Sequence, residues 1–177
     1  VRSIVELVEG RIGHYVFASS TVTYGSCKLP PMTEDFPMDR GPLQSEYGMN
    51  KILCEDYLID RHRRTGLPVT IVPFSMVFGP NNIIPDREQR MFKRLIEGRP
   101  VLIQGDGTTL GQVGHVADQA RALRLLMGNP LTFGQKYNLT GRDYFTDEGY
   151  VDACAAAVGV EPRKVFVPPP VMDELHA

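Results

Sequence analysis

The sequence has few cysteines, little net charge and no long apolar run, and each of these absences excludes a class of site or of binding partner. Three cysteines are an odd number with no close pair, so neither a disulfide framework nor a zinc site is expected. A formal net charge of −2 creates no global basic field that would attract nucleic acid or an anionic membrane. No apolar run approaches the ~20 residues needed to cross a bilayer. We therefore expect a globular protein of the reducing cytoplasm, with no membrane partner.

The first residue is Val1 rather than Met, and we expect no secretory leader. Apolar residues at positions 1, 4, 5 and 8 already have helical spacing, and Gly10 follows as a stop signal. An amphipathic helix that begins at the first residue without a cap is typical of an element cut off upstream. We therefore expect the 177 residues to be the C-terminal part of a longer protein.

What the sequence does contain is a tyrosine and a lysine four positions apart, Tyr47 and Lys51, and a serine upstream, Ser20. On one helix, side chains at this spacing lie on the same face, about 6 Å apart at Cβ. A phenol is a poor base near neutrality because its pKa is ordinarily about 10, and a neighbouring ammonium favours the phenolate. The Ser20 hydroxyl would then hold a substrate alcohol against the tyrosine. The pair alone favours a plain surface helix, so further motifs are needed.

The surrounding pattern predicts alternating strands and helices. Residues 14–19 are a short apolar run typical of a buried parallel strand, and 45–64 has helical spacing that ends in basic residues. Residues 69–78 are expected to form the next strand, interrupted by Pro73. The proline-rich stretch 27–42 is expected to be an irregular loop, where sites in α/β proteins usually lie. Strand, loop, helix and strand are the order of a right-handed parallel crossover.

The sequence beyond Pro80 alternates shorter elements of the same kinds. Apolar spacing and turn signals predict helices at 87–97, 116–127 and 147–157, and strands at 101–103 and 136–139. We expect one domain over 1–80 and a second over 81–177.

Five short motifs occur in a fixed order along the chain. They are Ser20 four residues before Tyr24-Gly25, then Tyr47-xxx-Lys51, Val77-Phe78-Gly79-Pro80, Gly105-Asp106-Gly107 and His115-Val116-x-Asp118. This ordered set resembles the extended short-chain dehydrogenase/reductases, the NAD-dependent epimerase/dehydratase family, over roughly residues 12–150.

The resemblance implies an α/β fold. Residues 1–80 would be the remaining, C-terminal part of a Rossmann-type parallel sheet, and 81–177 mainly a small α/β substrate-binding domain. Family members begin with a strand and a glycine-rich turn that places the cofactor pyrophosphate at a helix N-terminus. No such turn occurs here, so the glycine-rich N-terminal half is expected to be absent, and the fragment would expose an open sheet edge. NAD is the implied cofactor, and NADP is possible because the missing half distinguishes them.

The resemblance also implies a role for each motif residue. Ser20, Tyr47 and Lys51 would be catalytic: Tyr47 exchanges a proton with a sugar-like alcohol as hydride passes to the cofactor, Lys51 assists it and binds the nicotinamide ribose, and Ser20 orients the substrate. Cofactor contacts are implied for Ser19, Tyr47, Lys51 and Pro73. Substrate contacts are implied for Thr21, Met76, Asn81 and His115, and no metal is expected. His115 has an equal alternative as a structural histidine, and Asp118 is expected to be a helix cap.

Four positions, Pro73, Gly111, Thr21 and Val22, depart from the family pattern. Sugar-nucleotide epimerases commonly have two arginines where Pro73 and Gly111 stand here. Their loss removes bidentate phosphate contacts, which weakens the case for the nucleotide-diphosphate sugar that the family implies. Dehydratases have an Asp-Glu pair where Thr21-Val22 stands, so a 4,6-dehydratase is not expected.

Three functions stay open. The first is an NAD(P)-dependent epimerase or oxidoreductase acting on a sugar nucleotide or sugar-like alcohol. The second is an RNA-binding protein on the same fold, because Asn81 to His115 also resembles the chloroplast stem-loop-binding relatives. The retained Ser20, Tyr47 and Lys51 favour the enzyme, and the net charge of −2 disfavours a general RNA binder. The third is a scaffold that mainly dimerises.

A homodimer of the full-length protein is also implied, since the tyrosine helix often builds the family's dimer interface. Here the signal is mixed, because the half of 46–64 expected to be exposed combines three apolar and three acidic residues: Leu53, Tyr57, Ile59, Glu55, Asp56 and Asp60.

Overall fold

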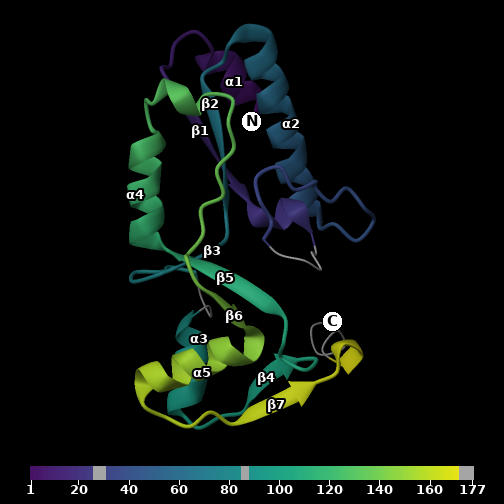
Figure 1. The fold of residues 1–177 in the computed structure, drawn as a ribbon, viewed down its shortest axis with the longest axis vertical. Helices are drawn as coiled ribbons and strands as arrows, with labels where there is room; N and C mark the ends of the chain where they lie inside the picture. The colour runs from purple at the N-terminus through teal and green to yellow at the C-terminus, as the bar shows by residue number, and fades with distance from the viewer. Residues whose placement is uncertain (26–30, 85–87, 172–177) are drawn as a thin grey trace. The chain divides into compact units, whose positions relative to one another are not determined.

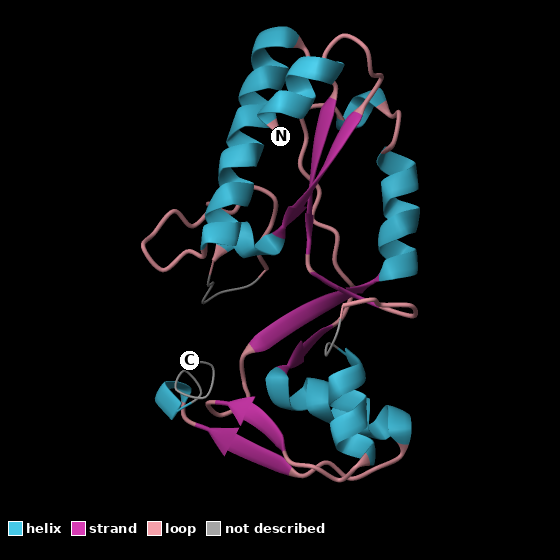
Figure 2. Ribbon diagram, turned by 180° about the vertical axis from the view of Figure 1, so that it is seen from behind, coloured by secondary structure: helices cyan, strands magenta, loops and turns pink. Residues whose placement is uncertain are grey.

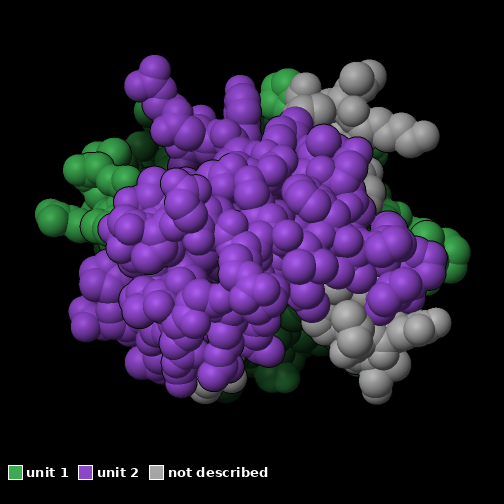
Figure 3. Space-filling view, turned by 90° about the horizontal axis from the view of Figure 1, so that it is seen from below, with its two compact units in different colours: residues 1–77, 114–140 green, residues 78–113, 141–177 purple. Residues whose placement is uncertain are grey.

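The computed structural model describes residues 1–25, 31–84 and 88–171, which divide into two compact units. The first comprises 1–77 and 114–140, and the second comprises 78–113 and 141–177 (Figure 3). The division expected from the sequence, 1–80 and 81–177, had placed 114–140 with the second unit. Residues 114–140 belong to the first unit, because 134–139 runs beside strand β2 (Val69–Phe74) and hydrogen-bonds to it.

The first unit is built on two parallel strands, β1 (Tyr15–Ser20) and β2, in register from Tyr15↔Val69 to Ser20↔Phe74. Helices α1 (Arg2–Val8) and α2 (Glu46–Thr65) lie on one side of the strands, and α4 (Val116–Leu126) lies on the other (Figures 1 and 2). The predicted parallel crossover is therefore confirmed. Among the described residues β1 pairs with no strand except β2, so its other edge is open.

Helix α2 covers the strands because its buried residues, Gly48, Ile52, Glu55 and Leu58, recur every three or four positions. The helix begins where Ser45 Oγ accepts the Gly48 N–H at 3.0 Å, and it ends at Gly66, whose φ of 74° favours glycine. The core beneath it draws on four segments of the chain: Val5, Phe17, Leu58, Leu67, Val69 and Ile71. Each such buried side chain stabilises the fold by about 1.5–3 kcal/mol relative to exposure.

Pro73 does not interrupt its strand, contrary to the sequence-based expectation. It lies inside β2, where its carbonyl accepts the Leu139 N–H at 2.9 Å. The absent N–H removes one hydrogen bond from this ladder but does not end the strand. The break falls instead at Ser75, and β3 (Met76–Phe78) follows. The strand predicted at 136–139 is present only as two isolated bridges to β2.

The second unit packs α3 (Glu88–Ile96) and α5 (Asp147–Val158) against the parallel pair of β4 (Val101–Gln104) and β7 (Lys164–Val167). Its core is a separate cluster: Leu95, Val101, Ile103, Val151, Cys154 and Ala155.

The sequence predicted neither β7 nor the next two strands described. β5 (Leu110–His115) pairs antiparallel with β6 (Tyr144–Thr146), and the three-stranded sheet has the order β3-β5-β6. Two glycines within β5 weaken its strand propensity, so pairing with distant residues decides its conformation.

In the described part of the chain no helix has the length and apolar character to cross a membrane, and no three His, Cys, Asp or Glu side chains gather as a metal site. Cys54 and Cys154 are free thiols. Cys27 and the start of the predicted loop lie outside the described residues, while 31–45 is irregular as predicted.

Candidate functional site

The candidate site forms where β1 ends and α2 begins. Ser20 is the last residue of β1 and the N-cap of the 3-10 helix η1 (Thr21–Tyr24), and its Oγ accepts the Val22 N–H at 3.4 Å. Since Oγ only accepts that bond, its O–H can still donate to a ligand. Gln44 joins the start of α2 to this point, because its Nε2 donates to Val22 O at 2.9 Å. Tyr47, one turn further, is thereby held at the same end of the strands as Ser20.

Lys51 joins α2 to β1 from the same helix as Tyr47. Its Nζ donates to the Ala18 carbonyl at 2.7 Å and lies 5.0 Å from the centre of the Phe17 ring. The same Nζ lies 5.6 Å from the centre of the Tyr47 ring. The ammonium is thus fixed by the strand while it stays within cation–π distance of the tyrosine. An anchored cation beside an accessible phenol, 58% exposed here, is an arrangement that can support proton transfer.

A second tyrosine, Tyr24, lies near this end of the sheet and is unsuited to proton transfer. It is buried, and its hydroxyl donates to Asn138 Oδ1 at 2.8 Å. Burial raises the pKa of the Tyr24 phenol to about 12, although the Asn138 bond acts in the opposite direction. Tyr24 therefore stays protonated and serves the packing of η1. Of the two, only Tyr47 has the accessibility that an acid or base needs.

A buried ion pair between Glu55 and Lys136 lies beside Ser19, the residue before Ser20, and was not predicted from the sequence. Ser19 Oγ donates to Glu55 Oε1, and Lys136 Nζ lies 2.6 Å from Glu55 Oε2. Glu55 is 1% exposed and the Lys136 side chain 16% exposed, so placing Glu55 on the exposed half of its helix was wrong. The available signal was its position four residues after Lys51, on the same helix face. The partner Lys136, 81 residues away, gave no such signal.

The expected cofactor contacts differ in their access to a ligand. Ser19 is buried and its hydroxyl is engaged with Glu55, and the Pro73 ring is fully buried within β2. Neither side chain presents a surface to a cofactor in this structure. Tyr47 is exposed and Lys51 is half-buried, so these two side chains remain accessible to a ligand.

The expected substrate contacts do not all belong to one unit. Thr21 begins η1 directly after Ser20, and Met76 is exposed two residues beyond the end of β2, so both lie at the carboxyl ends of the strands. His115 is in the first unit, as the N-cap of α4, where its Nδ1 accepts the Ala117 N–H at 3.3 Å. Asn81 belongs to the second unit and has a positive φ of 64°.

Two details correct or explain the sequence-based assignments. Asp118 is not the cap of α4, because His115 holds that position while Asp118 forms an ion pair with Arg121. At Gly111 an added Cβ would lie 2.9 Å from the Phe145 ring. A larger side chain at position 111 would therefore require the Phe145 ring to shift.

Comparisons with known proteins identify relatives of this chain. The chain is 30% identical over 164 residues to the chloroplast stem-loop binding protein of 41 kDa b of Arabidopsis thaliana, covering 92% of this chain and 41% of that protein. It is 27% identical over 135 residues to an uncharacterized UDP-glucose epimerase, YtcB, of Bacillus subtilis, covering 76% of this chain and 42% of that protein. The chain thus spans less than half the length of these relatives.

Two solved structures have the same fold. The structure of MoeE5 in complex with UDP-glucuronic acid and NAD superposes with a TM-score of 0.78 at 29% identity, over 94% of this chain and 55% of that one. The dTDP-glucose 4,6-dehydratase of Bacillus anthracis, in complex with NAD, gives a TM-score of 0.82 at 23% identity, over 94% and 53%. The second likeness shows the fold alone.

The sequence profile of one family matches residues 2–140, which is most of the chain and includes Ser20, Tyr47 and Lys51. The Rossmann-type parallel strands of the first unit and the solved neighbours agree with that match. The chain belongs to the NAD dependent epimerase/dehydratase family.

Proposed function

We propose that the complete protein is an NAD(P)-dependent epimerase or oxidoreductase acting on a sugar nucleotide or a sugar-like alcohol. Tyr47 exchanges the proton with the substrate alcohol, Lys51 assists it, and Ser20 orients the alcohol. One observation carries the proposal: Lys51 Nζ is held 2.7 Å from Ala18 O and 5.6 Å from the Tyr47 ring, at the strand end where Ser20 lies. The UDP-glucuronic acid and NAD bound to MoeE5 support this class of substrate and cofactor.

The residues present fit a nicotinamide cofactor at one position. An ammonium has three N–H donors, and Ala18 takes one of those of Lys51, so two remain for a ribose hydroxyl and the phenolate. NAD supplies a hydride acceptor when it is bound. Ser19, expected to contact the cofactor, instead acts through Glu55 to hold the end of β1 in place. Further strands beside the open edge of β1, with the pyrophosphate site, would come from the rest of the protein.

The substrate would lie over the carboxyl ends of β1 and β2, where ligands of open α/β sheets bind. Thr21 and Met76 border this position, while substrate contacts of His115 and Asn81 stay predictions. A homodimer would use the outer side of α2, on which Leu53 is 55% exposed.

A single substitution in the complete protein tests the catalytic role. Tyr47→Phe removes the hydroxyl and retains the ring, so turnover should fall by about 10²–10⁴-fold while NAD binding is unchanged. Tyr57→Phe is the matched control, because Tyr57 is on the same helix and its ring packs against the core of the first unit. The guanidinium carbon of Arg2 lies 5.3 Å from the centre of that ring. Turnover of Tyr47→Phe within a few-fold of the wild type would remove Tyr47 from the chemistry.

A second candidate function is RNA binding on the same fold. The supporting observation is the 30% identity, over 92% of this chain, to a stem-loop binding protein. In this case the complete protein should bind an RNA stem-loop with an affinity that falls steeply with salt. RNA binding without any substrate-dependent NADH signal would favour this function over the enzyme.

A further inference from the structure

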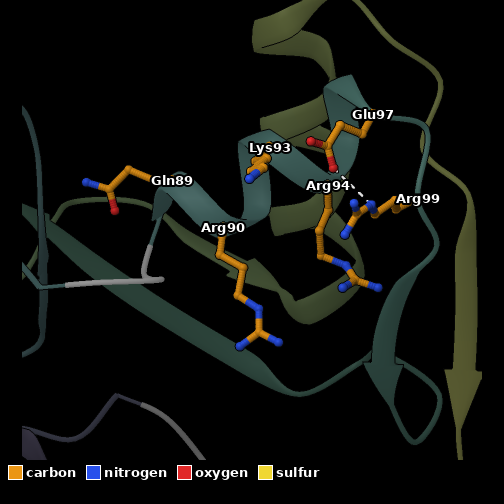
Figure 4. Close-up of a pocket in the computed structure, with 6 residues that line it drawn as sticks. All are labelled: Gln89, Arg90, Lys93, Arg94, Glu97 and Arg99. Carbon is orange, nitrogen blue, oxygen red and sulfur yellow. Dashed lines mark ion pairs between the residues drawn. The ribbon is translucent and has the colours of Figure 1, made fainter.

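The outer side of α3 concentrates positive charge in the second unit. A hollow of about 360 Å³ is lined by one polar, one acidic and four basic residues: Gln89, Arg90, Lys93, Arg94, Glu97 and Arg99 (Figure 4). We call Arg90, Lys93, Arg94 and Arg99 the α3 basic face. None of the residues assigned to proton transfer lines this hollow.

The amphipathic sequence of α3 turns these side chains outward. Met91, Phe92 and Leu95 pack into the core of the second unit. Residues 90, 93, 94 and 97 follow the spacing i, i+3, i+4 and i+7, so they share the opposite side of the helix. The Arg90 and Arg94 side chains extend from α3 toward the same side (Figure 4). Adjacent turns therefore present cations about 5 Å apart along the helix axis.

Little of this charge is neutralised. Glu97 pairs with Arg99, whose Nε lies 2.9 Å from its Oε2. Arg94 donates to the Pro100 carbonyl at 2.6 and 3.1 Å, which orients the guanidinium but leaves its charge uncompensated. Arg90 and Lys93 have no hydrogen-bond or ion-pair partner in the described ranges. With one carboxylate against four cations, the hollow has a local charge of +3 although the chain as a whole is at −2.

We propose that the α3 basic face binds the phosphate backbone of a structured RNA. This inference rests on the second candidate function and names its contact surface. Arginine and lysine side chains supply the phosphate contacts of such interfaces. No aromatic side chain lines the hollow, so it offers no platform for stacked bases and would follow the backbone without reading sequence. The net charge of −2 for the whole chain does not prevent binding of RNA at the α3 basic face. Exposed charges more than about 10 Å from the bound phosphates are largely screened at 0.1 M salt.

The test uses the complete protein and a fluorescein-labelled RNA stem-loop. The double variant Arg90→Ala/Lys93→Ala removes two cations of the face, neither of which has an ion-pair or hydrogen-bond partner among the residues that the structure describes. The control, Arg63→Ala/Arg124→Ala, removes two exposed cations from the first unit and gives the same net charge. Binding is measured by anisotropy between about 0.05 and 0.2 M salt, because each lost phosphate contact should flatten the log–log salt slope by about 0.9. Substrate turnover with NAD is measured on the same preparations.

The face variant should flatten the salt slope by about 2 and weaken binding by at least about tenfold near 0.1 M salt, while the control changes neither. Equal losses in both variants would overturn the assignment of this face. So would full displacement of the RNA by poly-glutamate at the same charge concentration, which would indicate an acidic protein partner. If the wild type binds no RNA, the second candidate function itself fails. If the wild type binds RNA and the face variant binds equally well, only this inference fails. Turnover reports on the enzyme proposal independently.

Discussion

Helices α2 and α3 both cover an apolar core, but they use charge in opposite ways. α2 buries Glu55 and neutralises it with Lys136 from a distant segment, directly behind Ser19. α3 exposes Arg90 and Lys93 with no partner in the described part of the chain. Burying a charge is costly unless it is paired, so the first arrangement holds a site in one geometry. Exposed cations of one sign cost little and remain available to an anionic partner.

The strongest test of this contrast removes the counterion of Glu55. Lys136→Met keeps most of the side-chain volume but leaves a carboxylate buried with only the Ser19 hydroxyl, so the free energy of unfolding should fall by about 3–5 kcal/mol. Urea unfolding followed by circular dichroism measures the loss. The double variant Glu55→Gln/Lys136→Met should regain part of it, because no unpaired charge remains. A loss below about 1 kcal/mol for the single variant would show that the pair is not a buried one in solution.

A pH dependence tests a half-buried polar contact of the first unit, at His14. Gly128 N–H donates to His14 Nδ1 at 3.0 Å, and His14 Nε2 lies 2.9 Å from Thr70 Oγ1, which itself donates to Thr132 O at 2.7 Å. These partners require a neutral ring that donates from Nε2. Burial lowers the pKa of His14 below its usual 6.5.

Below about pH 6.5 the unfolded chain therefore binds more protons at this residue than the folded chain. The stabilisation is complete above that pH and is lost as the pH falls toward the lower folded-state pKa. His14→Gln should reduce the difference in unfolding free energy between about pH 7.5 and about pH 5. His62→Gln is the control, since His62 lies in the same unit and its Nδ1 donates to Leu67 O rather than accepting an N–H. An unchanged pH difference in His14→Gln would contradict the assignment.

The smallest effect is expected at an exposed ion pair of α2. Arg64 Nε lies 3.4 Å from Asp60 Oδ2, and both side chains are largely exposed. Arg64→Ala should change the free energy of unfolding by less than about 0.5 kcal/mol. The same urea experiment serves as the measurement, and a loss comparable to that of Lys136→Met would remove the distinction between buried and exposed charge on this helix.

Local chemistry made much of the fold and the site predictable from the sequence. The Ser45 cap, the stop at Gly66 and the period of α2 lie within twenty or so residues of Tyr47 and Lys51, so the shared helix followed directly. Contacts between distant segments were not predictable. Such contacts place 114–140 in the first unit and form the strand at 110–115. They also pair Glu55 with Lys136. The homodimer and the cytoplasmic location stay predictions.

In the proposed enzyme Ser20, Tyr47 and Lys51 act together on one reacting alcohol. A crystal structure of the complete protein with NAD and a substrate alcohol tests it most directly. We expect one substrate hydroxyl within about 2.6–3.2 Å of both Tyr47 Oη and Ser20 Oγ, with Lys51 Nζ still bonded to Ala18 O. A bound substrate whose hydroxyls all lie beyond hydrogen-bond reach of Tyr47 would contradict it.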